Sequence, residues 1–523
     1  MGLDTFLHNL HFDIDKASPA DGEVDWDDAP LPYKIYRGLP VFSLSLEVPL
    51  TLEEWEEPEQ PNLRRISHFF WYVFGLTQFS QSAFPTEDQA PELMQSYRRF
   101  VPSGGALYPN ELYVYLKTED FPVGVYHYDV AHHRLVLLRE GNFDSYIAKA
   151  LGNRCDVSAC FGTVFVSTMF WKNFYKYNNF AYRLQGLDAG VLIGQLLEVA
   201  KRFGFASGVY FQYLDRAINH LLGLTEKEES VYAVIPLTVE PTSWFTNGSG
   251  RNELVSAAEL CRELKAIQTN YYIQSQRIKT FPMLTKMNEA SMLESTQSFR
   301  QIKAREKLNV ESQAVTLPHM KRLSYDLASV CQKRFSPDMD FIFGKVSQSK
   351  LSTLLQEATT AYLYRNDLDE PHKKLESRVS LYGCLNNVEG IPNGAYQYDS
   401  ADHTLRQANL GDHRLNLQYG MSAGNVNLFQ VPLCFHVAGD KDHFISELGY
   451  RGYRIQQMEA GMLVQRLLLV ASALEMGGHP LLGFEAKLSD EIYKMNNQGK
   501  TSLIQIPIGP YRPRPWLQGR LQS

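Results

Sequence analysis

The sequence lacks the features that identify secreted and membrane proteins. Six cysteines among 523 residues, with no CxxC pair, are too few and too scattered for a disulfide framework. No apolar run reaches the roughly 20 residues that a bilayer crossing needs; the best one, residues 461–474, contains Gln465 and Arg466. The first residues have neither a basic start nor an apolar core, unlike a signal peptide. We therefore expect a cytoplasmic protein with reduced thiols.

An excess of positive charge is also missing. Lys and Arg number 51 and Asp and Glu number 58, so the net charge is −7. A mildly acidic chain gives no electrostatic reason to bind nucleic acid or a membrane surface. His and Cys show no metal-ligand spacing, so no metal site is expected. Hydrophobic residues make up 44% and charged residues 21%, which predicts an ordinary globular protein with a large core.

Several common catalytic motifs are absent. The chain has no GxGxxG fingerprint and no nucleophile elbow. Residues 498–501 (QGKT) resemble half of a phosphate-binding loop, but the glycine that the motif needs at position 494 is Lys494. The sequence thus gives no sign of a Rossmann dinucleotide site, a hydrolase triad or a P-loop.

What the sequence does contain is an internal repeat. Residues 124–129 (GVYHYD) return 270 residues later as 394–399 (GAYQYD), and residues 182–190 (YRLQGLDAG) return 271 residues later as 453–461 (YRIQQMEAG). One residue of drift over sixty positions is a single insertion or deletion. A period this long predicts a duplicated domain and not a solenoid.

Each copy shows the same order of expected elements. A helical run (69–79 and 341–358) precedes short strands, a buried strand, a long apolar helix (188–203 and 459–476) and a final strand. This order predicts an α+β fold with a mixed or antiparallel sheet covered by helices. The expected domains are an extended arm at 1–60, a first domain at 61–245, a helical linker at 246–328 and a second domain at 329–523.

The most informative segment is 99–109, which reads RFVPSGGALYP. Two glycines after Pro-Ser allow a tight turn and a close approach of the backbone to a planar ligand. From chemistry alone, a purely structural loop explains the segment equally well. The second copy has HKKLESR at 372–378 instead, so the glycine loop occurs once in the duplicated chain. An asymmetric feature in a symmetric scaffold favours function.

This loop, the GVYHYD strand, Lys176-Tyr177 and the helix around Asp188 together resemble the SagB-type dehydrogenases, from about residue 26 to residue 237. Residues 330–514 match the same pattern more loosely. The chain length and the duplication resemble the cyanobactin-type oxidases within that family. The resemblance implies two tandem nitroreductase-like domains that imitate a two-fold dimer, with FMN held between them.

The resemblance also assigns the flavin site. In such enzymes one subunit holds the phosphate and the other places the Pro-Ser loop over the ring. The second half carries an Arg-x-Ser motif and a basic pair after its last strand, whereas the first half has TVEPTSW after its last strand. One composite site is therefore expected. The residues expected to bind FMN are Pro102, Ser103, Gly104, Gly105 and Leu107 of the first half and Arg334, Ser336, Gly483, Arg512 and Arg514 of the second half.

The catalytic pair implied by the resemblance is Lys176 and Tyr177, because the second copy has Glu447-Leu448 in their place. A lysine buried beside the flavin has a lowered pKa and serves as a base. The implied reaction is oxidation of peptide thiazolines and oxazolines to thiazoles and oxazoles, with dioxygen as the electron acceptor. Asn178-Asn179-Phe180 departs from the family pattern and leaves the local turn open.

Two other functions stay open from the sequence. One is an NAD(P)H-dependent nitroreductase or flavin reductase acting on small molecules, and the other is a non-catalytic scaffold that holds a peptide. The precursor peptide, the ring preference and leader dependence are not specified by the sequence. The sequence also does not specify whether the duplicated chain forms a homodimer. Nor does it specify whether residues 1–60 and 246–328 contribute to peptide binding.

Overall fold

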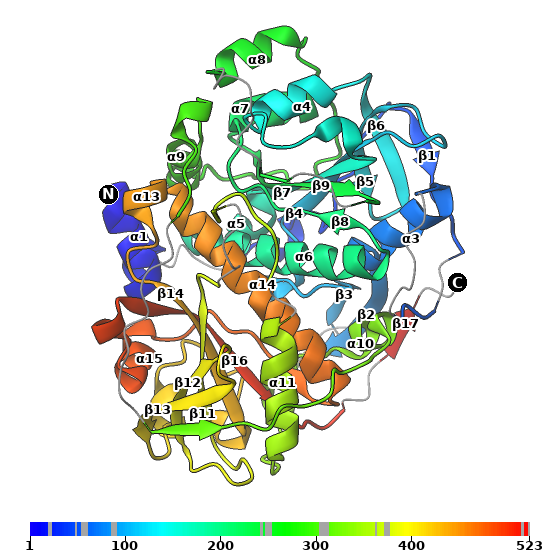
Figure 1. Ribbon diagram of the computed structural model, residues 1–523. Helices are drawn as coiled ribbons and strands as arrows, with labels where there is room; N and C mark the ends of the chain where they lie inside the picture. Colours follow the sequence, from blue (N-terminus) through cyan, green and yellow to red (C-terminus); the bar gives the residue numbers. More distant parts are fainter. Residues whose placement is uncertain are drawn as a thin grey trace.

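Two seven-stranded sheets lie on either side of a central pair of long helices (Figure 1). The computed structural model describes residues 1–18, 24–47, 50–53, 61–84, 92–240, 244–245, 254–302, 313–360, 363–370, 377–513 and 517–520. Within these ranges no helix is both long enough and apolar enough to cross a membrane. The α+β fold expected from the sequence is confirmed.

The two sheets repeat each other strand by strand. The order β1-β6-β5-β4-β7-β9-β8 in the first sheet corresponds to β10-β13-β12-β11-β14-β16-β15 in the second, and all ladder pairs are antiparallel. The first sheet contains β1 (Val41–Ser43), β4 (Asn110–Leu116), β5 (Gly124–Asp129), β6 (Arg134–Glu140), β7 (Gly162–Met169), β8 (Ala206–Ser207) and β9 (Glu229–Thr238). The second contains β10 (Ala314–Thr316), β11 (Ser380–Leu385), β12 (Gly394–Asp399), β13 (Thr404–Leu410), β14 (Leu433–Asp440), β15 (Gly477–Gly478) and β16 (Lys500–Gly509). A third, small sheet joins β17 (Leu517–Arg520), β2 (Leu76–Phe84) and β3 (Glu92–Arg99).

Helices cover the faces of these sheets, which is why central strands such as β4 and β9 are buried at every position. The α-helices of the first half are α1 (Leu3–Phe12), α2 (Ile14–Ala17), α3 (Leu63–Phe74), α4 (Asp144–Ala150), α5 (Trp171–Tyr177), α6 (Ala181–Arg202) and α7 (Asp215–Leu222). The remaining ones are α8 (Ala257–Glu263), α9 (Pro282–Ser291), α10 (Leu327–Lys333), α11 (Gln348–Thr360), α12 (Arg414–Tyr419), α13 (Ile445–Leu448), α14 (Arg451–Ala473) and α15 (Ala486–Tyr493).

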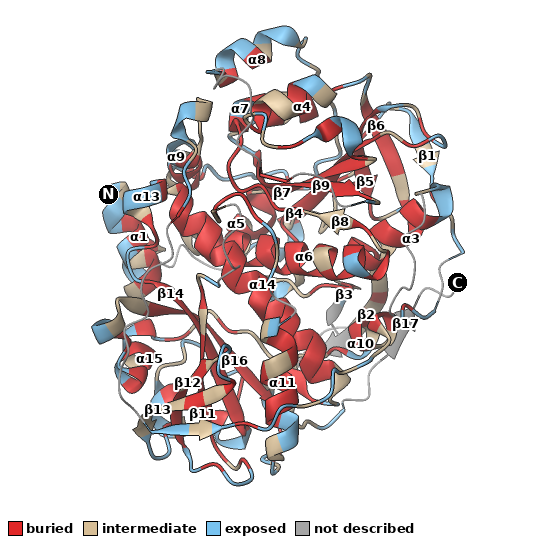
Figure 2. Cartoon of the chain, in the orientation of Figure 1, coloured by how far each residue is buried: buried red, intermediate tan, exposed pale blue. Residues whose placement is uncertain are grey.

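Helices α6 and α14 form the contact between the halves, and both are buried along nearly their whole length (Figure 2). A Cβ on Gly190 would lie 2.0 Å from the Met458 carbonyl oxygen, and one on Gly461 would lie 2.2 Å from the Leu187 carbonyl oxygen. Glycine at both positions therefore permits backbone contact between the helices. The rings of Tyr182 and Tyr453, which are repeat partners, stack with centres 5.8 Å apart.

Several predicted boundaries were wrong. Helices α6 and α14 begin before the predicted 188 and 459, because their first turns bury polar side chains such as Arg183 that break an apolar pattern. The run predicted at 69–79 is helical only to Phe74, since Gly75 ends α3 and strand β2 follows. The run predicted at 341–358 is the helix α11, which starts later, at Gln348.

The arm and the linker also differ from the prediction. Strand β1 lies within the predicted arm and β10 within the predicted linker, so each supplies an edge strand to one sheet. The linker, predicted to be helical, contains α8 and α9 but is otherwise largely irregular over its described residues. The proposed domain boundaries stay predictions.

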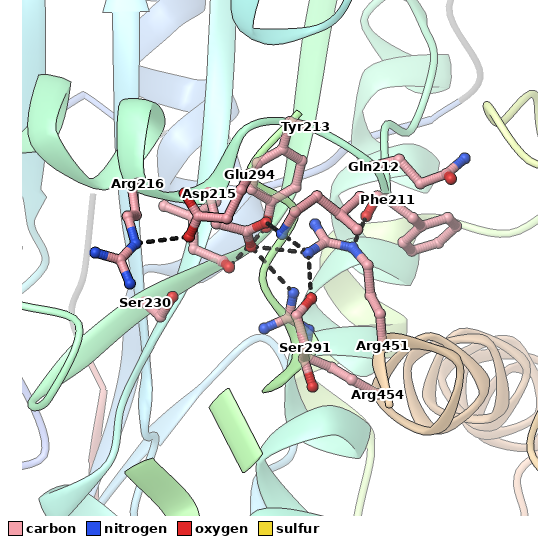
Figure 3. Close-up of polar contacts among 12 residues, drawn as sticks. Phe211, Gln212, Tyr213, Asp215, Arg216, Ser230, Ser291, Glu294, Arg451 and Arg454 are labelled. Atoms are coloured by element: carbon pink, nitrogen blue, oxygen red, sulfur yellow. Dashed lines mark hydrogen bonds and ion pairs between the residues drawn. The ribbon is translucent and has the colours of Figure 1, made fainter. Parts of the chain in front are cut away.

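A buried ion pair connects the two halves at the start of α14 (Figure 3). Arg451 Nη1 donates to both carboxylate oxygens of Asp215, at 2.8 and 2.7 Å, and Arg454 Nη2 lies 3.4 Å from Oδ1. The side chains of all three residues are at most 1% exposed. Asp215 begins α7 of the first half, whereas both arginines belong to α14 of the second half. The contact therefore joins the two halves through charged groups that are shielded from water.

Candidate functional site

The Pro-Ser-Gly-Gly loop lies between β3 and β4 and is held by a carboxylate of α6. Ser103 Oγ donates to Asp188 Oδ2 at 2.6 Å, and the Gly104 amide donates to Asp188 Oδ1 at 3.1 Å. The Tyr108 amide donates to Ser103 Oγ at 2.9 Å and closes the turn. The loop is thus fixed from below, while Gly105 at its tip is exposed. An exposed glycine backbone on a fixed base suits close contact with a flat ligand.

The loop tip lies against the Lys176-Tyr177 pair at the end of α5. Gly105 has a φ of +64°, and a Cβ on it would lie 2.5 Å from the Tyr177 hydroxyl and 3.2 Å from Lys176 Nζ. Glycine is required here both for its backbone conformation and for space. The structure therefore brings together the two asymmetric features of the first half.

Burial changes the proton affinities at this site. It lowers the pKa of Lys176, which increases the fraction of free amine at a given pH. Burial raises the pKa of Tyr177 to about 12, with a further contribution from the charge of Asp188, so Tyr177 is a proton donor near neutral pH. The pKa of Asp188 is raised to about 6 by burial, against the opposing effect of the Ser103 and Gly104 hydrogen bonds. A base and a hydrogen-bond donor thus lie side by side.

Two arginines, one from each half, lie near the base of the same loop. Arg98 of β3 donates to the carbonyl oxygen of Arg334, which follows α10. Arg334 is 5% exposed, and its Nε has no hydrogen-bond partner among the described residues. Burial and the neighbouring charge of Arg98 lower the pKa of Arg334 to about 10. A half-buried Arg98 and a buried Arg334 with an unpaired donor form a cationic pair that fits a phosphate group such as that of a flavin nucleotide.

The other expected phosphate residues are placed less uniformly. Ser336 is half-buried beside Phe335, whose ring stacks on Tyr511 at 5.3 Å. Arg512 bonds Asp340 through its backbone amide and has an exposed side chain. Arg514 lies outside the described residues. Ser336 lies two residues after Arg334, and Arg512 directly follows Tyr511. The stacking of Phe335 on Tyr511 holds these two chain segments together.

Gly483, Pro102 and Leu107 complete the expected set. Within 4 Å of a Cβ on Gly483 lie only atoms of Ser422, so none of those contacts is with the loop or with Arg334. Pro102 and Leu107 flank the Ser103 turn and are half-buried. The structure thus brings the loop tip against Lys176 and Tyr177 and joins Arg334 to Arg98, whereas Gly483 has a different neighbour.

The matching position in the second half is occupied by an ion pair. Glu459, the repeat partner of Asp188, accepts from Arg378 Nε at 3.0 and 3.1 Å and from the Tyr364 hydroxyl at 2.9 Å. Arg378 also pairs with Asp369. In the second half, a guanidinium therefore binds the carboxylate that one loop amide and a serine hydroxyl bind in the first half.

Three contributors were missed by the sequence reasoning. Asp188 was part of the repeat and of the family resemblance but was not predicted as a site residue, although the Asp188/Glu459 pair places a carboxylate at the same position of both halves. Arg98 carries no local signal for its contact with Arg334, which is 236 residues away. The third is Trp26, whose ring centre lies 5.1 Å from Lys176 Nζ.

The fold is that of nitroreductase-like proteins. Residues 78–237 match the model of the nitroreductase family. The crystal structure of a candidate nitroreductase from Anabaena variabilis is similar over 98% of this chain and 99% of that chain, with a TM-score of 0.72 and 20% identity. At that identity the likeness establishes the fold alone, and it extends over both halves.

Two further similarities are to a trifolitoxin-processing protein and to a microcin synthetase complex. The chain is 32% identical over 142 residues to the trifolitoxin-processing protein TfxB of Rhizobium leguminosarum bv. trifolii, which is 25% of this chain and 37% of that protein. The chain therefore spans little more than a third of that relative. A chain of the E. coli microcin synthetase McbBCD complex, solved with truncated pro-MccB17, covers 39% of this chain at 19% identity with a TM-score of 0.29, too low to support an argument.

Proposed function

We propose that this chain is an FMN-dependent oxidoreductase that converts thiazoline and oxazoline rings of a ribosomal peptide into thiazoles and oxazoles. The observation that carries the proposal is the contact of the Gly105 loop tip with Lys176 and Tyr177. Removing hydrogen from a ring requires a base that takes the ring proton as well as an acceptor for the hydride, and Lys176 is the proposed base. The similarity to a trifolitoxin-processing protein supports a peptide substrate.

The residues of this chain have separate tasks in the proposal. FMN, when bound, supplies a two-electron acceptor for a hydride. Arg334 and Arg98 would hold its phosphate, and the Ser103–Gly105 backbone would lie along its ring. Lys176 Nζ takes the proton from the ring Cα, while the neighbouring ring carbon loses the hydride and the ring becomes aromatic. Tyr177, protonated near neutral pH, orients the substrate by donating a hydrogen bond.

The lowered pKa of Lys176 supports its role as the base, because a free amine is needed before the proton can move. Dioxygen is the proposed final electron acceptor, which leaves the protein ready for another ring. Asp188 contributes indirectly, since its carboxylate fixes the loop through Ser103 and Gly104. We describe it as a positioning residue.

The test is direct. The purified yellow protein is incubated in air with a synthetic peptide that contains one thiazoline, and the mass of the product is measured by mass spectrometry. We expect the loss of two hydrogens per ring. An unchanged peptide, in a preparation that contains flavin, would contradict the proposal.

The family match over residues 78–237 favours one second candidate, a nitroreductase that uses NAD(P)H. Steady NAD(P)H oxidation with a nitroaromatic acceptor, together with unchanged thiazoline peptide, would support it. A colourless, flavin-free protein that binds peptide would instead support the scaffold function.

A further inference from the structure

A cavity of about 80 Å³ opens beside α5, between the N-terminal arm and the linker. Its walls are mainly apolar and aromatic. They include Leu31 and Tyr33 of the arm, Met169 and Trp171 at the junction of β7 and α5, and Ile278 and Phe281 of the linker. Cavities with such a lining commonly bind apolar groups.

The buried polar side chains around the cavity already have partners within the protein. Lys34 Nζ donates to Glu229 at 2.7 Å, and Lys172 pairs with Glu111. The Ser275 hydroxyl accepts from Trp171 Nε1 at 2.9 Å and donates to the Asp28 carbonyl oxygen at 2.8 Å. With these groups satisfied, the cavity offers an occupant chiefly apolar contact.

A row of aromatic side chains joins the cavity to the candidate catalytic pair. The Trp26 ring centre is 5.1 Å from Lys176 Nζ and 6.0 Å from the Tyr175 ring, which is 6.2 Å from the ring of Trp171 on the cavity wall. Trp26 itself is 58% exposed. Three such steps correspond to roughly three to five residues of extended peptide, at about 3.3 Å per residue.

The cavity belongs to one half of the molecule. Trp171 corresponds to Asp442 in the second copy, 271 residues later, and Asp442 is exposed. The cavity walls from the arm and the linker come from outside the repeated segments. The cavity therefore occurs beside the same half that carries the glycine loop, Lys176 and Tyr177.

We infer that this cavity binds a bulky apolar side chain of the peptide substrate, roughly three to five residues from the ring that reaches Lys176. The inference rests on the proposed function for its choice of a peptide as occupant. It gives the arm and the linker a shared role: each supplies one wall of a pocket that selects substrates by a residue distant from the ring. A substrate is then recognised at two separate points.

The experiment measures binding apart from catalysis. The probes are fluorescein-labelled Ser/Gly peptides with one thiazole, a ring that cannot be oxidised further. In one pair of peptides, Leu or Ser stands four residues before the thiazole. In a second pair, Leu or Ser stands four residues after it. Fluorescence anisotropy gives their affinities for the flavin-loaded protein, for Ile278→Asp and for the control Leu415→Asp. Ile278 is 48% exposed at the cavity and Leu415 is 52% exposed on α12, so both variants should fold.

Of the two Leu peptides, the one that binds more tightly is compared with its Ser counterpart. We expect the wild-type protein and Leu415→Asp to bind this Leu peptide with an affinity about tenfold higher, or more. Ile278→Asp should lose that preference, and Ile278→Leu should keep it. An absent preference in the wild type, or an equal preference in Ile278→Asp and Leu415→Asp, would overturn the inference.

A short thiazoline compound without flanking residues separates this result from the proposed function. Its oxidation should proceed equally in the wild type and in Ile278→Asp, because it does not reach the cavity. If the compound is not oxidised but the Leu preference holds and depends on Ile278, the proposed chemistry fails and the binding pocket stands.

Discussion

Asp188 and Glu459 occupy matching positions on α6 and α14, yet Asp188 binds the Ser103–Gly104 turn whereas Glu459 binds Arg378. The first arrangement leaves a glycine backbone open to solvent. In the second, a guanidinium bonds both Glu459 and Asp369. The pair thus distinguishes an exposed glycine loop in the first half from an ion pair at the matching position of the second half.

The first prediction concerns stoichiometry. We expect one FMN per chain, because the loop occurs in one half and Arg378 binds the matching carboxylate in the other. Flavin absorbance after denaturation, divided by the protein concentration from amino-acid analysis, measures the ratio. A ratio near two would show that both halves bind flavin.

The second prediction concerns the phosphate anchor. Arg334→Gln should yield folded protein with little flavin, since a charge-assisted bond contributes about 1.5–3 kcal/mol. Arg512→Ala should lose less flavin, because the Arg512 side chain is exposed. Arg64→Ala, at an exposed position of the first half, is the control and should retain its flavin. Greater flavin loss in Arg64→Ala than in Arg334→Gln would show that the phosphate anchor lies in the first half and not in the second.

The third prediction concerns the base. Lys176→Ala should slow ring oxidation by about 10²–10⁴-fold while the protein stays yellow. In the wild type, kcat/KM should rise with pH as Lys176 loses its proton, with an apparent pKa below the 10.5 of an ordinary lysine. The raised pKa of Tyr177, about 12, keeps its proton in place over that range.

The control for the base is the response of the flavin alone. Reduction by dithionite and reoxidation in air should be unchanged in Lys176→Ala, because neither step requires a proton acceptor at the ring. Tyr177→Phe should keep the rising pH limb at a lower rate, whereas Lys176→Ala should lose it. Near wild-type oxidation by the Lys176→Ala, Tyr177→Phe double variant would show that the base lies elsewhere.

The fourth prediction concerns the contact between the halves. Asp215→Asn should destabilise the protein by about 3–5 kcal/mol, because Arg451 and Arg454 would keep buried charges without their carboxylate. Denaturant unfolding followed by circular dichroism measures the change. Arg216→Ala removes the neighbouring ion pair with Glu294, whose partners are 55% and 53% exposed, and should cost at most about 1 kcal/mol. Similar losses in both variants would contradict this reading of the interface.

Much of the fold could be predicted because the repeat fixes it twice. Tyr182 and Tyr453 were matched by sequence alone, and they stack across the interface. Element boundaries were less accessible, since buried polar residues such as Arg183 interrupt the apolar period that locates a core helix. The irregular path of the linker carries no periodic signal at all.

The candidate site divides in the same way. The loop and Lys176-Tyr177 could be found because they break the symmetry of the repeat. The contact of Arg98 with Arg334 could not, since it depends on how two distant segments meet. The cavity beside α5 was equally hidden, because its walls at Leu31, Trp171 and Ile278 come from three separate parts of the chain.

Joining both units in one polypeptide has a consequence for assembly. In a homodimer, a residue that suits one copy is imposed on the equivalent position of the other. Here Lys176 and Glu447 differ, as do Asp188 and Glu459, so the two halves of one chain carry different residues at equivalent positions. The two halves are always made in equal number, and the covalent connection holds them together at any protein concentration.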